Sequence, residues 1–310
     1  MRYSVIIPSY NNWAAIERVL GAAVAQAGEA EIIVVDSSTD GTTEKLRASF
    51  PGITLLHPPQ RLLPGPARNL GASTASGDIL IFLDGDCLPD AGWLNGFRAA
   101  AAGLDAGIVC GSVDLDEPAD LSQFMEYLIW KLPENSKVPR GPYGFVITEN
   151  MMIRRQDFLR TGGFGESDSA NDAQMDVARR AAGLAVTFEP AARVFHIHPR
   201  GWRLHFAKLH RIGVETAPLI RSLKGYRMGR WMALLFPVVF LVRWLRISAR
   251  VVGYRPQWLG RYVQVQPMLW TGLLTYQFGL WRGLFRVLGS SSAAQTLSSE
   301  RPNGGPADHR

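Results

Sequence analysis

Two carboxylates separated by a single glycine follow an apolar run in the first third of the chain. The run Ile79–Leu83 leads directly into Asp84, Gly85 and Asp86. Five consecutive apolar residues predict a fully buried strand. Either acid alone would fit a turn or a helix cap, but two neighbouring carboxylates repel one another unless a cation or hydrogen-bond donors compensate. Their oxygens suit a divalent cation that also holds phosphate groups, so the spacing predicts a metal and a phosphate-containing ligand.

Short β-branched runs alternate with helical segments through the first 200 residues and would position these acids. We expect strands over residues 3–7, 31–35, 53–56 and 79–83, with helices after Asn12 and over residues 66–75. This alternation implies crossover connections and a mainly parallel sheet covered on both faces, which is an α/β fold. Ligands of such sheets bind beyond the carboxyl ends of the strands. Asp36 and Asp84 both follow predicted strands, so both are candidates for that crevice.

The chain divides into regions of opposite charge. Residues 1–198 hold 16 basic and 24 acidic side chains, a net charge of −8, whereas residues 199–287 hold 15 basic side chains and one acid, a net charge of +14. Six of the nine tryptophans lie in the second region. We expect an α/β domain over residues 1–199, a basic and aromatic-rich helical region over 200–288, and a Ser/Gly/Pro-rich disordered tail over 289–310.

The cysteines and the first residues predict a cytosolic setting. Cys87 and Cys110 lie in apolar, strand-like surroundings and form no disulfide framework. The sequence MRYSVIIPSY lacks the charged start, long apolar region and cleavage site of a secretory signal. We expect it to be the first strand, and no Cys/His spacing predicts a structural zinc site.

The basic region contains two apolar runs. Trp231–Val242 lies between Arg230 and Arg243, and Met268–Val287 is interrupted by polar residues. Neither reaches the roughly 18 to 20 uncharged apolar residues of a membrane span. Tryptophan, tyrosine and arginine around leucine-rich faces suit helices that lie in the interface of an anionic membrane. A soluble helical subdomain and a tilted hairpin that enters the bilayer are the alternatives; nucleic acid is disfavoured because no binding motif accompanies the charge.

Four motifs in the acidic region resemble, in order and spacing, those of the family 2 glycosyltransferases with a GT-A fold. They are SVIIPSYN at 4–11, VVDSSTDGT at 34–42, GPARNLGASTASGDILIFLDGDC at 65–87 and GGFGES at 162–167. The resemblance covers about residues 3–199. It implies an enzyme that moves a sugar from a nucleotide diphosphate to an acceptor with inversion at the anomeric carbon.

The same resemblance implies roles for individual residues. Asp36 would receive the nucleotide base, Arg68 would be the basic residue of the donor pocket, and Asp84 would lie near the ribose. Asp86 would be a ligand of Mg²⁺ or Mn²⁺. The complete nucleotide-sugar-binding set that it implies is Pro8, Tyr10, Asp36, Arg68 and Asp84.

Inversion in a single step needs a base opposite the leaving group, which takes the proton of the acceptor hydroxyl. The family places this base in a Glu-Asp pair shortly after the GGF motif, and in SANDAQMDVARRAAG the match is Asp172. Asn171 stands where the family usually has Glu, and Gln174 where it usually has Asp. Asp168 and Asp176 are the nearby alternatives. Asn171 or Asp172 could instead cap the helix that follows.

The sequence VFHIHP at 194–199 places two histidines on one face of a strand. Isolated histidines are more often core or surface residues than ligands. Several members of the family, however, carry a histidine just after the last core strand that closes over the metal and diphosphate. By this resemblance His198 fits better than His196, because it lies nearer the end of the strand.

We therefore expect a metal-dependent inverting glycosyltransferase that acts at the cytoplasmic face of the cell membrane on a glycan or a lipid-linked acceptor, as in the synthesis of cell-envelope polysaccharide. Two alternatives stay open. An Asp-x-Asp phosphatase or phosphotransferase is disfavoured because Cys87 replaces the usual hydroxyl residue and because Asp36 and Arg68 would have no role. A non-catalytic sugar-nucleotide-binding or scaffold protein would fit the departures at Asn171 and Gln174.

Overall fold

The computed structural model describes residues 1–103, 106–166, 171–217 and 235–299. The chain divides into two compact units, the first formed by Met1–Trp202 with Arg246–Leu269 and the second by Arg203–Leu245 with Trp270–Arg310. The first stretch ends within three residues of the boundary expected at residue 199. The first unit also includes residues 246–269, which the charge pattern had assigned to the basic region.

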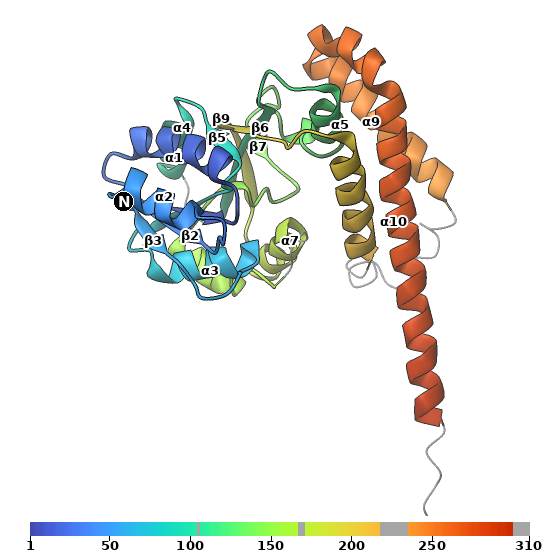
Figure 1. Ribbon diagram of the computed structural model, residues 1–310, viewed down its shortest axis with the longest axis horizontal. Helices are drawn as coiled ribbons and strands as arrows, with labels where there is room; N and C mark the ends of the chain where they lie inside the picture. Colours follow the sequence, from blue (N-terminus) through green and yellow to red (C-terminus); the bar gives the residue numbers. More distant parts are fainter. Residues whose placement is uncertain (104–105, 167–170, 218–234, 300–310) are drawn as a thin grey trace, which may run out of the picture. The chain divides into compact units, whose positions relative to one another are not determined.

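The first part of the chain alternates strands and helices as the apolar pattern predicts (Figure 1). Its elements are β1 (Tyr3–Ser9), α1 (Trp13–Ala27), β2 (Glu31–Asp36), α2 (Thr42–Ser49), β3 (Thr54–Leu56), α3 (Pro64–Thr74) and β4 (Ile79–Leu83). The predicted strands are confirmed to within two residues. The largest difference is in β1, which continues through Pro8 to Ser9.

Shorter elements complete the sheet and lead into the C-terminal helices. They are β5 (Cys87–Pro89), α4 (Trp93–Ala101), β6 (Ile108–Leu115), α5 (Leu121–Trp130), the 3₁₀ turn η1 (Leu132–Glu134), β7 (Gly141–Pro142), β8 (Asn150–Arg154), α6 (Arg155–Thr161), α7 (Asn171–Ala181), β9 (Val186–His196), α9 (Phe236–Tyr254), η2 (Pro256–Trp258) and α10 (Leu259–Ser299). Helix α10 continues past residue 289, where the sequence predicted a disordered tail; residues 300–310 lie outside the described residues.

The described strands form one sheet in the order β3-β2-β1-β4-β8-β6-β9-β5, with β7 paired to β9. The α/β class is confirmed. Strands β3, β2, β1 and β4 are parallel, as are β6 and β9, whereas β8 runs antiparallel between β4 and β6. The register pairs Leu83 with Asn150. The start of β8 therefore lies beside the carboxyl end of β4, where Asp84 follows.

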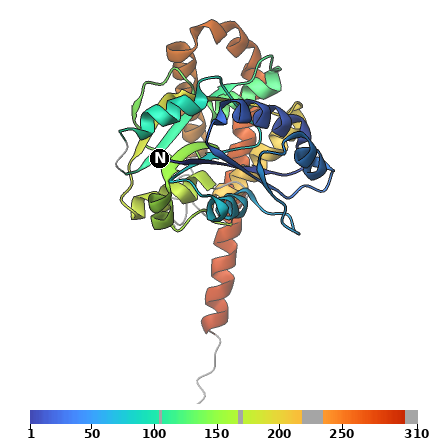
Figure 2. The same cartoon turned by 90° about the vertical axis from the view of Figure 1, so that its left-hand side faces the viewer.

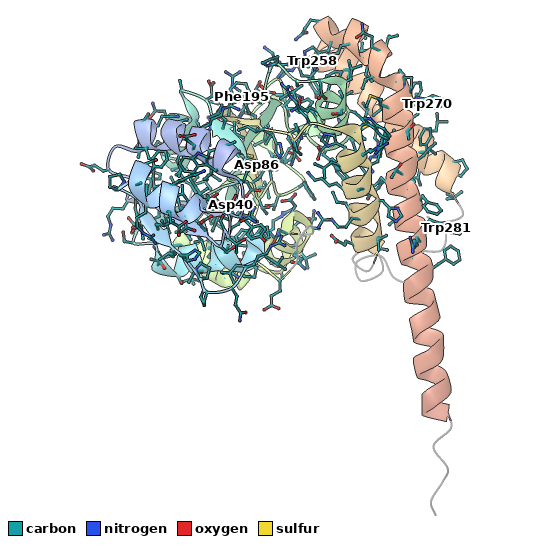
Figure 3. All side chains as sticks on the ribbon, in the orientation of Figure 1. Asp40, Asp86, Phe195, Trp258, Trp270 and Trp281 are labelled. Carbon is teal, nitrogen blue, oxygen red and sulfur yellow. The ribbon has the colours of Figure 1, made fainter. Side chains whose placement is uncertain are left out.

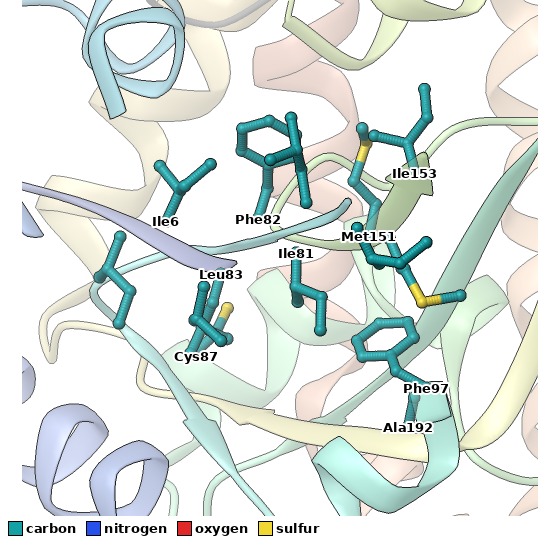
Figure 4. Packing of buried hydrophobic residues seen from close by; sticks show 14 of the residues in the cluster. Ile6, Ile81, Phe82, Leu83, Cys87, Phe97, Met151, Ile153 and Ala192 are labelled. Atoms are coloured by element: carbon teal, nitrogen blue, oxygen red, sulfur yellow. The ribbon is translucent and has the colours of Figure 1, made fainter. Parts of the chain in front are cut away.

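Helices cover both faces of this sheet. Figures 1 and 2 show α1 and α4 on one face and α3 and α7 on the other. Successive strand residues point to opposite faces, and Figure 4 shows Phe82 on one side of β4 and Ile81 on the other. Gly71 allows α3 to approach β1, since a Cβ atom there would lie 2.5 Å from Cγ2 of Ile6. The close approach fixes the position of α3, which carries Arg68.

Charged and aromatic side chains attach residues 246–269 to the rest of the first unit. The Arg255 guanidinium lies 2.6 Å from the Asp114 carboxylate, and Arg261 lies 2.7 Å from Glu117. The Trp258 ring meets the rings of Phe124 and Tyr127 edge-on, with centroids 5.4 and 5.6 Å away. These contacts to α5 and β6 explain why the segment belongs to the first unit.

The second unit is helical and closely packed. A Cβ atom at Gly279 of α10 would lie 2.2 Å from the backbone oxygen of His210, and one at Gly213 would lie 2.3 Å from that of Tyr276. The missing side chains thus let the helical stretch 203–217 and α10 approach each other at backbone distance. Within the described part of the chain, no helix combines the length and apolar character that a membrane crossing requires.

The contacts of Trp258 predict its contribution to stability. We expect Trp258→Ala to lower the free energy of unfolding by about 2 kcal/mol, roughly half the cost for a fully buried tryptophan, because the ring is half-buried against α5. Leu159→Ala, at a residue that is 71% exposed on α6, should change it by less than about 0.5 kcal/mol. Chemical denaturation of both variants checks this, and equal losses would contradict it.

Candidate active site

A pocket opens at the carboxyl ends of β1 and β4. It contains two of the residues predicted from the first motif, Pro8 and Tyr10, and both acids of the Asp-x-Asp pair. Arg61 supplies a cationic side chain and lies over the Tyr10 ring, 4.2 Å from its centroid. The full lining is Pro8, Ser9, Tyr10, Asn12, Arg61, Leu62, Pro64, Ala67, Asp84, Gly85 and Asp86.

Arg68 forms the buried wall behind Asp84. Its side chain is 2% exposed, and Nη2 donates a short hydrogen bond to Oδ1 of Asp84. Among the described residues, Nε and Nη1 of Arg68 have no hydrogen-bond partner. A guanidinium carries five N–H donors, and leaving buried donors unsatisfied costs free energy. This arrangement suits an anionic ligand that reaches the Asp84 side of the pocket.

Asp36 is turned inward and does not line this pocket. The side chain is fully buried; Oδ1 accepts a 2.6 Å hydrogen bond from Ser38 and Oδ2 one of 2.5 Å from Thr43. The Ser38 hydroxyl oxygen in turn accepts the backbone N–H of Asn11 at 2.7 Å. In this structure Asp36 therefore fixes the loop that follows β1, and through it the Tyr10 wall of the pocket.

Strand pairing places a histidine beside Asp86. Strand β5 pairs antiparallel with β9 so that Cys87 faces His196, and the Ile197 N–H donates to the Asp86 carbonyl at 2.8 Å. Nε2 of His196 is consequently 3.8 Å from Oδ2 of Asp86. The ligand atoms of Asp86, Cys87 and His196 lie within 4.8 Å of one another. Figure 3 labels Asp86 within the α/β unit.

Two of these three groups fit a divalent cation. Burial, followed by the nearby Glu149, Asp86 and Asp84 carboxylates, raises the pKa of the Cys87 thiol well above its usual value, so the sulfur stays protonated and is a weak ligand. The Asp86 carboxylate is 37% exposed, and an imidazole nitrogen lies close to it. One carboxylate, one imidazole and oxygens from water and phosphate form a set that Mn²⁺ or Mg²⁺ accepts.

His198 lies beyond the end of β9 and faces α5. Nδ1 is 3.3 Å from Oε2 of Glu126, and Gln123 donates to the His198 carbonyl at 2.5 Å. The two histidine rings are 4.1 Å apart, centroid to centroid. The structure thus places His196 next to Asp86 and His198 beside His196, and the metal role expected for His198 stays a prediction. The position of His196 beside Asp86 follows from the register of β5 against β9, and the spacing of the two histidines in the sequence does not reveal this register.

Asp172 lies in the first turn of α7 and is held by another segment of the chain. Its Oδ1 accepts the backbone N–H of Thr148 at 2.9 Å and a short hydrogen bond from the Thr148 hydroxyl. Asp176, one of the alternatives, is bound on both oxygens by Arg179 and Arg180 of its own helix, each at 2.8 Å. Asp168 lies outside the described residues.

A buried charge cluster adjoins Asp172 and Asp84. Nζ of Lys131 lies 2.5 Å from Glu149 and 3.8 Å from Glu134. Burial raises the pKa of Glu149 to about 7 and that of Glu134 to about 8, although Lys131 opposes both shifts. Burial alone would lower the pKa of Lys131, but Glu149, Glu134 and Asp172 raise it well above its usual value. One lysine therefore faces more carboxylates than it can neutralise.

Residues 4–161, half of the chain, match the family described as Glycosyl transferase family 2. The chain belongs to this family. The resemblance drawn from the four motifs is thereby confirmed, and the pocket with Pro8, Asp84 and Asp86 lies within the matched residues.

Curated relatives carry related names. The chain is 36% identical over 122 residues to glycosyltransferase AglE of Haloferax volcanii, which covers 37% of this chain and 40% of that protein. It is 27% identical over 224 residues to the pre-mycofactocin glycosyltransferase of Mycobacterium tuberculosis, which covers 70% of this chain and 47% of that protein. The chain spans less than half the length of these two relatives.

Solved structures share the fold. The mannosyltransferase PcManGT of Pyrobaculum calidifontis, solved in complex with GDP-Man and Mn²⁺, has a TM-score of 0.58 at 19% identity and covers 90% of this chain and 86% of its own. GalNAc-T7 with UDP, GalNAc and Mn²⁺ has a TM-score of 0.52 at 19% identity, covering 64% of this chain and 44% of its own. The GT-A fold predicted from the sequence is confirmed.

Sequence reasoning missed three residues of this family 2 domain. Thr148, Glu149 and Lys131 adjoin the predicted site residues, but they lie in no motif that had been assigned a role. A buried lysine needs a carboxylate partner, so the sequence offers only the general expectation that Lys131 in the apolar stretch after residue 120 is paired. Which acid pairs with it depends on long-range packing.

The two histidines give a test of the metal site. We expect His196→Ala to weaken Mn²⁺ binding at least about tenfold, the usual cost of losing a partner at a metal site, because its imidazole adjoins Asp86. His198→Ala, at a side chain that faces Glu126, should weaken it less. Electron paramagnetic resonance of free Mn²⁺ with UDP or GDP present measures both. A larger loss in His198→Ala would reverse the assignment.

Proposed function

We propose that this chain is a metal-dependent inverting glycosyltransferase that moves a sugar from a nucleotide-diphosphate donor to a lipid-linked or membrane-proximal acceptor at the cytoplasmic face of the membrane. The observation that carries the proposal is the pocket at the ends of β1 and β4, which is lined by the Asp84 and Asp86 carboxylates and has the buried Arg68 guanidinium against Asp84. Two acids and a cation with open donors suit a ligand that brings both phosphate and a metal ion.

Donor binding uses groups of both charges. Nε and Nη1 of Arg68 have no partner among the described residues and can donate to anionic or hydroxyl oxygens near Asp84. Arg61, held over the Tyr10 ring at the pocket wall, supplies a second cation. Asp86 and His196 would hold the divalent ion. When bound, Mg²⁺ or Mn²⁺ supplies Lewis-acid stabilisation of the departing diphosphate, and the Mn²⁺ in the two related structures supports this assignment.

In this proposal Asp172 is the general base. Its carboxylate accepts the proton of the acceptor hydroxyl while the hydroxyl oxygen forms a bond to the anomeric carbon. The bond from that carbon to the nucleoside diphosphate breaks at the same time, so one glycosidic bond replaces one sugar–phosphate bond and the configuration inverts. The hydrogen bonds from Thr148 support the assignment, because they use Oδ1 alone.

Product analysis separates this function from its two rivals. Release of nucleoside diphosphate with transfer of the sugar supports the proposal, release of inorganic phosphate supports a phosphatase, and donor binding without turnover supports a scaffold. The phosphatase is disfavoured because a nucleophilic Asp84 would have to leave its ion pair with the buried Arg68. A thermal-shift screen of nucleotide sugars with Mn²⁺ or Mg²⁺ identifies the donor to be used, since bound ligand raises stability.

Replacing the proposed base tests the chemistry. We expect Asp172→Asn to retain donor binding and to lose at least about a hundredfold in transfer rate, because an amide cannot accept the proton. Asp176→Asn on the same helix should keep most of the rate, since Asp176 is bound to two arginines. Isothermal titration with donor and a transfer assay measure the two effects. Loss of transfer in Asp176→Asn alone would assign the base to that residue instead.

The membrane part of the proposal rests on an apolar face of α10. Five large side chains between residues 270 and 285 are 42 to 54% exposed and follow one another at intervals of four, four, three and four residues. That spacing puts them on one face of the helix; Figure 3 labels two of them. They are Trp270, Leu274, Phe278, Trp281 and Phe285. Together with the net charge of +14 over residues 199–287, this face suits an anionic bilayer surface.

Flotation with liposomes tests this face. We expect wild-type protein to bind anionic vesicles in preference to neutral ones and to be released by high salt. Phe278→Ser/Trp281→Ser should weaken binding at least about tenfold, because each large side chain contributes roughly 1.5 to 3 kcal/mol when buried in lipid. Leu159→Ser, at a side chain 71% exposed on α6, is the matched control and should bind normally.

Three results would contradict the membrane proposal in different ways. Equal binding to both lipid types at all salt concentrations would remove the electrostatic contribution. No flotation of the wild type would favour a soluble helical subdomain. Resistance of the bound protein to both salt and alkaline carbonate would favour insertion into the hydrocarbon.

A further inference from the structure

Three consecutive residues, Thr148 and Glu149 in the turn before β8 and Asn150 at its start, contact both halves of the proposed site. They follow a loop and lie outside the four motifs by which the family was first identified. Each of the three makes a different long-range contact through buried groups. The three residues are 3%, 8% and 0% exposed.

Asn150 anchors the segment in the sheet. Its Oδ1 accepts the indole N–H of Trp93 at 2.9 Å, and its Nδ2 donates to the carbonyls of Ser112 and Ala192 at 3.0 and 2.8 Å. These partners belong to α4 and to the strands β6 and β9. Both polar atoms of the Asn150 side-chain amide, Oδ1 and Nδ2, thus form hydrogen bonds, which hold the start of β8 in a fixed position.

Glu149 connects the anchored segment to the donor side. Its backbone carbonyl accepts the N–H of Asp84 at 3.0 Å, which continues the β4–β8 ladder to the acid that adjoins Arg68. Its side chain lies 2.5 Å from Nζ of Lys131, at the end of α5. The hydrogen bond from Asp84 therefore fixes the backbone of Glu149, and the ion pair with Lys131 fixes its side chain.

Thr148 connects the same segment to the acceptor side. Both of its donors, the backbone N–H and the hydroxyl, reach one oxygen of Asp172, Oδ1. Asp172 lies in the first turn of α7, 24 residues further along the chain. A carboxylate oxygen held by two donors cannot rotate away without losing both, so the orientation of the carboxylate follows the position of Thr148.

We propose that Thr148 is the positioning residue of the base, and that the Thr148–Asn150 segment sets the separation between the leaving-group side at Asp84 and the proton-accepting side at Asp172. By occupying Oδ1, Thr148 leaves Oδ2 as the oxygen that meets the acceptor hydroxyl. This inference rests on the proposed function, in which Asp172 is the base. Misplacing a reacting group by about 1 Å costs on the order of a hundredfold in rate, so loss of the hydroxyl should affect the chemical step.

The test compares Thr148→Val with Thr148→Ser. Valine keeps the branched shape and the backbone N–H but has no hydroxyl, whereas serine keeps the hydroxyl. We expect Thr148→Val to lower kcat about ten- to a hundredfold with donor KM and donor Kd unchanged, and Thr148→Ser to retain kcat within a few-fold. Thr275→Val is the matched control, because it removes a 2.7 Å hydroxyl–carbonyl hydrogen bond on α10; its kcat should equal that of the wild type.

Other results overturn the inference in distinguishable ways. An unchanged kcat in Thr148→Val would refute it directly, and equal impairment of Thr148→Ser and Thr148→Val would make the role one of packing. Thr148→Ala lacks the hydroxyl without adding bulk and replaces the valine variant if that variant fails to fold. If the wild type transfers no sugar, the proposed function has failed; crystal structures of the variants then decide the positioning claim, since an Asp172 carboxylate that is unmoved in Thr148→Val refutes it.

Discussion

The antiparallel pairing of β8 with β4 is the constraint on which the site depends. Strands β1, β2 and β4 are parallel and end at one edge of the sheet, so their carboxyl ends supply the pocket lining. Strand β8 begins at that edge only because it runs in the opposite direction. A shift of one residue in this register would turn the side chains of β8 to the other face and would move Thr148 and Glu149 away from their partners.

Ion pairs fix the positions of the charged side chains, as strand pairing fixes the position of the backbone. Arg68 lies against Asp84, and Lys131 lies against Glu149. Each pair joins a helix-borne cation to a carboxylate next to a strand end, so the groups cannot reorient independently. Charged groups that are fixed in advance can stabilise the charge that develops in a transition state without first reorienting. This preorganisation is the main source of electrostatic catalysis. Nε and Nη1 of Arg68 have no hydrogen-bond partner among the described residues, and a bound nucleotide sugar would supply acceptors for them.

The sequence predicts those features that depend on local pattern. Apolar runs locate β1, β2 and β4, and the Asp-x-Asp pair lies where β4 ends, because burial and chain termination act within a few residues. Three features depend on distant pairing and could not be read in this way. The position of His196 beside Asp86 follows from the register of β5 with β9. The inward orientation of Asp36 depends on hydroxyls on the following loop and helix, and the attachment of Trp258 to α5 depends on tertiary packing.

The two departures from the family pattern place amides on the helix that carries Asp172. Asn171 and Gln174 stand where the family usually has acids, and both are packed closely: a Cβ atom at Gly65 would lie 2.6 Å from Oδ1 of Asn171, and one at Gly165 would lie 2.4 Å from Oε1 of Gln174.

Asp172, Glu149 and Glu134 all act on one lysine, Lys131. Burial raises the pKa values of Glu149 and Glu134 to about 7 and 8 although that lysine opposes both shifts. Carboxylates at positions 171 and 174 would add like charge to the helix that carries Asp172. Amides keep the hydrogen-bonding shape of the acids without their charge. In this chain the two amides therefore leave Asp172 as the acid in the first turn of α7.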